Sequence, residues 1–169
     1  MLTYLRRPKH RAAQALVEFS LVAPIFVLLL LGVIDFGRVG FYFVAGSALA
    51  RTGARDAAVY YKSFGETDAQ VVFSVQQQAQ AATMTLSQPA GCGTVTPPQP
   101  PTALSACQMP PLGQAYIFID RSNATFGAAF PYVKVSIVYA FRPTTPMLSD
   151  LTGTIYVVAT SAMNTEWTP

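Results

Sequence analysis

QALVEFSLVAPIFVLLLLGVI, residues 14–34, is the stretch that decides the fold. Its last sixteen residues, 19–34, carry no charge. A helix of that length spans about 24 Å, whereas the hydrocarbon core of a bilayer is about 30 Å thick. We therefore expect a transmembrane helix over residues 14–36, which either thins the bilayer or draws Glu18 or Asp35 toward the hydrocarbon.

The overall composition supports a membrane segment. Hydrophobic residues make up 51% of the 169-residue chain, and charged residues only 11%. Ordinary soluble domains carry about 25% charged residues. Because the excess apolar content is concentrated in the run described above, a membrane helix explains the composition better than an unusually apolar soluble core.

Positive charge is concentrated at the N-terminus. Four of the eleven Lys and Arg residues precede the apolar run: Arg6, Arg7, Lys9 and Arg11. From Gln14 onward, seven basic residues are outnumbered by eight acidic ones. A nucleic-acid binder keeps its positive charge on the folded surface, so this distribution argues against such a partner. By the positive-inside rule, residues 1–13 form a basic cytoplasmic leader, and the chain after its single span lies outside the cytoplasmic (inner) membrane.

The long helix is expected to continue past the membrane as far as Phe64. Small residues recur along it at helical spacing: Gly46, Ala50, Ala54 and Ala57. Small residues allow close approach of a second backbone. The partner is either the chain's own domain alone or, in addition, a neighbouring subunit. Asp35 and Arg38 are three residues apart, and we expect them to form a solvated pair on the helix surface.

Residues 37–169 predict one extracytoplasmic α+β domain. A second, shorter helix is expected over residues 67–85, with a weak apolar face made by Ala69, Val72, Phe73, Gln76 and Ala79. The strand signals lie in residues 115–120, 132–141 and 154–163. With no helix between them, these strands predict a three-stranded antiparallel sheet packed on the C-terminal half of the long helix. The connector over residues 142–153 is expected to be a loop.

Residues 87–113 predict a long loop, because seven of them are proline. Such a loop needs tethering or is mobile. It contains Cys92 and Cys107, the chain's two cysteines. On the outside of the membrane they are expected to form a disulfide, with two unpaired thiols as the alternative.

No set of residues points to catalysis. The sole histidine, His10, lies in the basic tip, and the two cysteines lack the spacing of metal ligands. We therefore expect a protein that is not an enzyme and has no metal, no cofactor and no small-molecule substrate.

Three interpretations of the N-terminus remain open. The first is a secretory signal peptide cleaved after residues 48–50, and the second is an uncleaved anchor. The third is a pilin-type leader, in which the basic tip is removed on the cytoplasmic side and the apolar helix stays as membrane anchor and assembly stem.

The stretch RAAQALVEFSLVAPIFVLLLLGVIDFGR, residues 11–38, resembles the opening of the TadE-like family, minor pilins or pseudopilins of the Tad (Flp) pilus system. Further similarity lies in ALARTGARDAAVYY, residues 48–61, and in VKVSIVYAFRPTTPMLSDLTGTIYVVATSAM, residues 133–163. The resemblance implies a pilin-like fold. It also implies that other pilins, the pilus assembly machinery and, if the leader is cleaved, a prepilin peptidase are partners.

The resemblance also implies roles for individual residues. The processing junction would lie between Ala13 and Gln14, where the family commonly has Gly in place of Ala13. Glu18 and Phe19 would serve assembly, with the Glu18 carboxylate paired to the new α-ammonium group of a neighbouring subunit. The alternative is that Glu18 lies hydrated at headgroup level without a partner.

The resulting expectation is a membrane-anchored minor pilin or pseudopilin that takes part in assembling a Tad-type pilus. The alternative is a single-pass anchored protein whose outer domain binds a ligand unrelated to pili.

Overall fold

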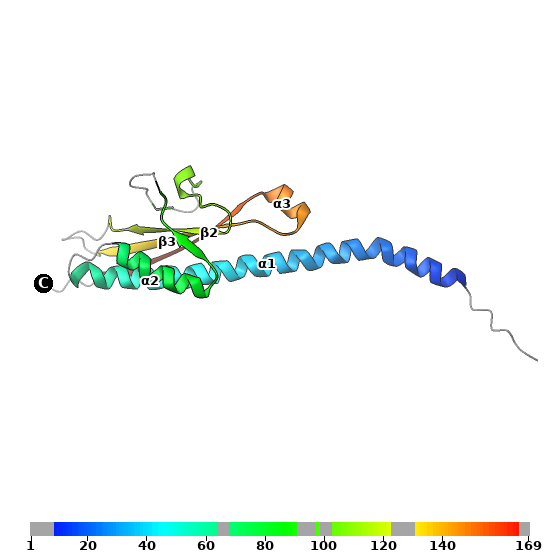
Figure 1. The fold of residues 1–169 in the computed structure, drawn as a ribbon, viewed down its shortest axis with the longest axis horizontal. Coiled ribbons are helices and arrows are strands. Elements are labelled where there is room, and N and C mark those ends of the chain that lie inside the picture. The colour runs from blue at the N-terminus through cyan, green and yellow to red at the C-terminus, as the bar shows by residue number, and fades with distance from the viewer. Residues whose placement is uncertain (1–8, 64–67, 91–96, 99–102, 123–130, 166–169) are drawn as a thin grey trace, which may run out of the picture.

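A single helix of 55 residues, α1 (Lys9–Ser63), runs the length of the molecule. The computed structural model describes residues 9–63, 68–90, 97–98, 103–122 and 131–165. The N-terminal half of α1 stands clear of every other described element, and its C-terminal half underlies the α+β domain (Figure 1). The predicted long helix is thus confirmed over its described length. We call α1 the stem.

The domain contains a four-stranded sheet with the strand order β1-β2-β3-β4. Its strands are β1 (Thr85–Ser87), β2 (Gln114–Asp120), β3 (Tyr132–Phe141) and β4 (Ile155–Asn164). β2, β3 and β4 are antiparallel neighbours, as predicted, whereas β1 pairs with β2 in parallel. The predicted three-stranded antiparallel sheet is therefore wrong in strand number and in being wholly antiparallel. β1 was missed because three residues are too few to show an alternating pattern.

The core lies between the sheet and the C-terminal half of α1. Ala50, Ala54 and Ala57 are 0% exposed and belong to this core. Gly53 approaches the domain most closely, because a Cβ atom there would lie 3.1 Å from Val75 Cγ2. The small residues of the stem thus pack against the chain's own domain, which both interpretations of the sequence include, and packing against a neighbouring subunit as well stays a prediction.

The second helix, α2 (Asp68–Ala81), lies beside α1 and is shorter than predicted. Its buried residues are Val71, Val72, Val75 and Ala79. Phe73, expected on the buried face, is 60% exposed. The buried face of α2 is therefore rotated relative to the predicted face. The valines recur at the spacing of one helix face, and this face leaves Phe73 on the outside.

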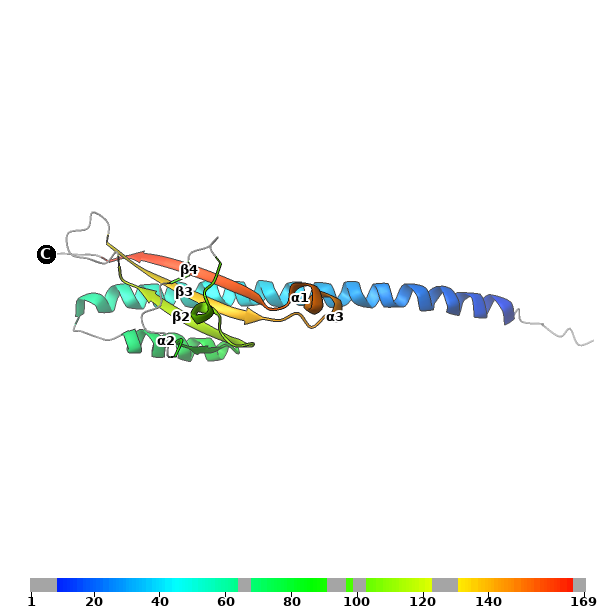
Figure 2. The same cartoon turned by 90° about the horizontal axis from the view of Figure 1, so that it is seen from above.

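The other face of the sheet is covered as well. Phe118, Val138 and Ala140 alternate along their strands with the residues that face α1, so their side chains point to the opposite face of the sheet. They are nevertheless buried. The short 3₁₀ helix η1 (Ala106–Gln108) lies on this side of the sheet in both views (Figures 1 and 2). Pro98 is also buried. The described parts of the Pro-rich segment thus form a second layer on the sheet.

The connector between β3 and β4 contains a helix, α3 (Pro146–Thr152), where a loop was expected. Pro146 stands in the first turn, where a missing N–H costs nothing, and Gly153 follows the helix with a positive φ of 63°. Pro and Gly therefore mark the two ends of this helix, whereas by composition alone both residues are also typical of a loop. α3 lies beside the middle of the stem (Figure 1).

Candidate functional site

The residues predicted for processing and assembly lie on the N-terminal half of the stem, which stands clear of the domain. We call this part the free half of the stem. Ala13, Gln14, Glu18 and Phe19 are all exposed there, and Phe19 is 71% exposed. Gln14 Nε2 donates a hydrogen bond of 3.2 Å to Glu18 Oε1, one turn further along the same helix. The Glu18 carboxylate is therefore presented on an open helix surface. The roles assigned to these four residues stay predictions.

The free half of the stem has the properties of a membrane helix. The segment Ala13–Val59 is long and apolar enough to cross a membrane, and its most apolar 18-residue window has a mean hydropathy of 2.5 with none of it buried. Large apolar side chains such as Leu21, Ile25 and Leu29 are more than half exposed. These side chains have no partner among the described residues, so their burial requires a lipid or protein environment.

Asp35 lies where the free half of the stem meets the domain, and its side chain is only 2% exposed. Its Oδ1 accepts a hydrogen bond of 3.0 Å from the backbone N–H of Thr144. Its Oδ2 accepts bonds of 2.8 Å and 2.7 Å from the N–H and the hydroxyl of Thr145. Because Thr145 is the residue before α3, this carboxylate fixes the start of α3 on the stem.

Arg38 completes the same arrangement. Its Nη1 lies 3.5 Å from Asp35 Oδ1 and also donates a hydrogen bond to Thr144 Oγ1. Its guanidinium carbon lies 5.1 Å from the centre of the Phe141 ring, in cation–π geometry. We call Asp35, Arg38, Thr144 and Thr145 the stem clamp. The expected pair of Asp35 and Arg38 is present, but the expectation that it is solvated is wrong, because the domain covers the carboxylate.

Aromatic residues extend the contact one turn beyond the clamp. The ring of Tyr42 stacks on that of Tyr139, with centroids 4.1 Å apart and an interplanar angle of 25°. Burial raises the pKa of Tyr139 well above its usual value, and a hydrogen bond with Tyr42 adds to the effect. Tyr139 therefore stays neutral at physiological pH, so this contact adds no charge to the junction.

Arg121 joins three elements at the opposite end of the domain. Its Nε donates a 2.8 Å hydrogen bond to Asp68 Oδ1 at the start of α2. Its Nη1 donates a 3.0 Å bond to the carbonyl oxygen of Ala57 near the end of α1. Sequence reasoning missed this contact, because nothing in the local pattern around Arg121 indicates partners more than fifty residues away.

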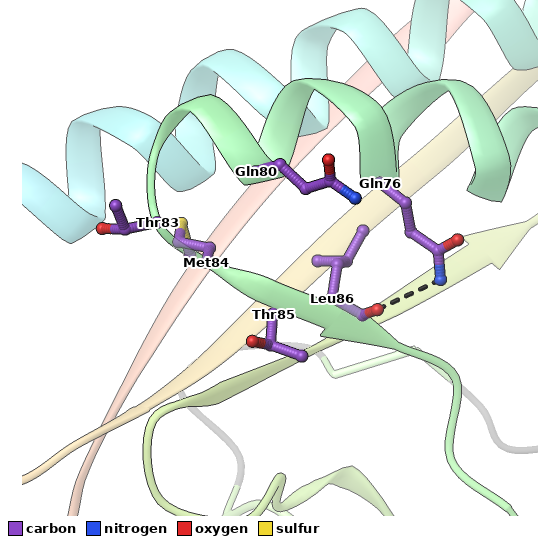
Figure 3. Close-up of a pocket in the computed structure, with 6 residues that line it drawn as sticks. All are labelled: Gln76, Gln80, Thr83, Met84, Thr85 and Leu86. Atoms are coloured by element: carbon purple, nitrogen blue, oxygen red, sulfur yellow. Dashed lines mark hydrogen bonds between the residues drawn. The ribbon is translucent and has the colours of Figure 1, made fainter.

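Two shallow hollows of about 380 Å³ each lie on the part of the domain that the structure describes. One lies between α2 and the edge strand β1, and Gln76 Nε2 donates a 3.1 Å bond there to the carbonyl oxygen of Leu86 (Figure 3). This bond satisfies a backbone group on an open sheet edge. The other hollow lies between α1 and the end of α2 and is mainly apolar, with Phe41 and Val44 on its wall. Neither hollow is lined by an ionisable side chain.

The predicted disulfide involves one residue that the structure describes. Cys107 lies in η1, on the layer that covers the sheet, whereas Cys92 lies outside the described residues. The pairing of the two cysteines stays a prediction.

No match was found among curated proteins or among solved structures. One protein family does match. The matched region includes most of the free half of the stem, the two stem residues of the clamp and the small residues that face the sheet. Residues 13–58 match the TadE-like protein family, which confirms over the stem the resemblance seen in the sequence.

Proposed function

We propose that this chain is a minor pilin or pseudopilin that takes part in assembling a Tad-type pilus. The observation that carries the proposal is the match of residues 13–58 to the TadE-like family on a helix that is free along one half and bears an α+β domain on the other. The protein would act through protein contacts and not as an enzyme. Its partners would be other pilins and the assembly machinery.

The stem would anchor the protein in the cytoplasmic membrane, with the N-terminus inside and the domain outside. The length and apolar character of the helix support the membrane anchor, and the four basic residues before the apolar run support the orientation. A prepilin peptidase would cut between Ala13 and Gln14 and leave Glu18 as the fifth residue of the mature chain. N-terminal sequencing tests this step, because a start at Gln14 supports the proposal and a start at Met1 favours an uncleaved anchor.

Glu18 would form the link between subunits. A carboxylate in a layer of low dielectric is tolerated when it is paired with a positive group. In the structure it is exposed, and it accepts a hydrogen bond from the side-chain amide of Gln14. A neighbouring α-ammonium group can therefore reach it without displacing any part of the domain.

The Glu18→Ala variant tests this role. It should enter the membrane as well as the parent, because the change makes the helix more apolar, but pili should be lost or greatly reduced. Membrane fractionation and electron microscopy of a strain that depends on this gene would measure the two effects. Ser20→Ala is the matched control, since it also makes the stem more apolar at a nearby exposed position but keeps Glu18 and the processing junction, and its pili should be normal. Normal pili with Glu18→Ala would remove the assembly role.

A further inference from the structure

The stem clamp sets the height of α3 along the stem. Thr145, the residue before α3, is bonded to Asp35, and Asp35 directly follows the uncharged apolar run. Phe36 is the next residue, and it is 81% exposed. If the stem spans a bilayer, as the proposed function requires, α3 is therefore held at the level where the stem leaves the membrane.

α3 presents large apolar side chains at that level. Leu151 is 84% exposed and Leu148 is 39% exposed. Leu151 and Phe36 are the two most exposed large apolar side chains among the described residues. Leu151 and Phe36 come from separate parts of the chain, and the clamp holds both at the same level along the axis of the stem. Side chains three apart lie on the same face of a helix, so Leu148 and Leu151 form one surface.

The charges near α3 suit a membrane surface. Arg142, which is exposed, and Arg38, which is 42% exposed, lie just before α3 and in the clamp, where lipid phosphates would be within their reach. Asp150 is also exposed, and because it lies two residues from Leu148 but next to Leu151, it stands at the edge of the leucine surface and not within it. A helix with leucines on one face and nearby basic side chains is typical of an element that lies in the membrane interface.

We propose that α3 is a second membrane contact, which seats Leu148 and Leu151 in the outer interface of the bilayer and holds the domain at a fixed height above it. The occupant of this surface is lipid, because the surface is level with the exit of the stem and continues its exposed apolar side. The stem alone would let the domain tilt, whereas a stem and a laterally placed helix together contact the membrane at two points.

Fluorescence quenching tests the proposal in the full chain. Trp167→Phe removes the only tryptophan. Three variants in that background then place an indole at α3 (Leu151→Trp), in the free half of the stem (Leu29→Trp) and on the domain (Phe73→Trp). Each is reconstituted in phosphatidylcholine–phosphatidylglycerol vesicles with or without brominated acyl chains. Leu151 and Phe73 are both well exposed, so an indole fits at either site without repacking the core.

Phe73 is the matched control. It lies on α2, whose Val75 contacts Gly53, eighteen residues along the stem from Asp35 and so about 27 Å from the clamp. Brominated lipid should reduce the emission of Leu29→Trp and Leu151→Trp by about half, because indoles in the chain region or the interface are within reach of the bromines. The emission of Phe73→Trp should not change.

The quenching of the three variants tests this inference separately from the proposed function. Quenching of Leu29→Trp without quenching of Leu151→Trp would overturn the membrane contact and leave a protein neighbour as the occupant of the α3 surface. Quenching of all three variants would also overturn it, because the domain would then lie flat on the bilayer. No quenching of Leu29→Trp would refute the membrane anchor itself, and the contact of α3 with it.

Discussion

At the scale of single residues, Asp35 shows how a carboxylate can stand at the end of a membrane helix. An isolated charge near hydrocarbon is costly, and it is tolerated when hydrogen bonds and an opposite charge satisfy it. Asp35 receives bonds from the N–H groups of Thr144 and Thr145 and from the Thr145 hydroxyl, with Arg38 close by. The short apolar run can therefore draw Asp35 toward the membrane without exposing its charge to lipid.

Replacing Asp35 by Asn should weaken the docking of the domain on the stem. The carboxamide keeps the shape of the side chain, but its NH₂ group faces an N–H or a hydroxyl that needs an acceptor. Leaving one or two buried donors unsatisfied should lower the free energy of unfolding by about 2–4 kcal/mol. Urea unfolding of the detergent-solubilised protein, followed by near-UV circular dichroism, would measure the change.

Asp150→Asn is the control for that experiment. It makes the same chemical change at an exposed position on α3, close to the clamp in sequence. Surface substitutions of this kind usually change stability by less than about 0.5 kcal/mol. Equal unfolding curves for the two variants would show that the clamp does not stabilise the domain.

At the scale of elements, α2 is held differently at its two ends. Val71, Val75 and Ala79 lie in the core along the whole helix, and the first turn has in addition the contact between Asp68 and Arg121. Arg121 is only 21% exposed, and its bond to the Ala57 carbonyl ties the same turn to the stem. The first turn of α2 is thus held by polar contacts in addition to the buried side chain of Val71, and the polar contacts are the part that opens more readily.

Arg121→Met should loosen this turn selectively. Methionine keeps an apolar stem of similar length but can donate no hydrogen bond to Asp68 or Ala57. Hydrogen exchange followed by mass spectrometry should show faster exchange in the first turn of α2, with the amides of β3 unchanged. Arg55→Met, at an exposed position of the stem, is the control and should leave both regions as in the parent. Unchanged exchange in α2 would mean that core packing alone fixes the helix.

The Pro-rich segment is an element in its own right, because it forms the second layer on the sheet. Its described parts hold few backbone hydrogen bonds, so a covalent link would contribute a large share of its order. A disulfide between Cys92 and Cys107 would close a loop of about 16 residues and stabilise the fold by about 3 kcal/mol in the chain-entropy model. We expect the cysteines to be paired in protein purified from its native membrane.

Alkylation under non-reducing conditions checks this pairing. Mass spectrometry should find no alkylated cysteine before reduction and two after it. Reduction should also lower the unfolding temperature. Two alkylated cysteines without reduction would contradict the disulfide and would count against an external location of the domain.

At the scale of the whole molecule, strong local periodicity is what made parts of the fold predictable. β3 has the predicted bounds, Tyr132–Phe141, because a run of ten β-prone residues strongly favours a strand. α1 was predicted because its apolar run is too long for a strand. The three residues of β1 carry no period, and α3 was hidden by its Pro and Gly.

The candidate site was predictable only in part, for a related reason. The exposed positions of Glu18 and Phe19 follow from the stem helix alone. The clamp could not be read from the sequence, because Asp35 and Thr144 are 109 residues apart and only the return of β3 toward the stem brings them together. A local pattern shows that Asp35 and Arg38 can pair, but not that a third segment covers them.

The orientation of the whole molecule gives the last prediction. Four basic residues precede the span, whereas Arg38 just beyond it is engaged with Asp35, so the charge bias favours a cytoplasmic N-terminus. A reporter enzyme that is active only outside the cytoplasm, fused after Pro169, should therefore be active. Replacing Arg6, Arg7, Lys9 and Arg11 by serine removes the bias and should reduce that activity, with equal expression checked by immunoblot. An inactive parent fusion that is expressed at the normal level would reverse the orientation. It would also place the α3 surface and the cysteines on the wrong side for the contacts proposed above.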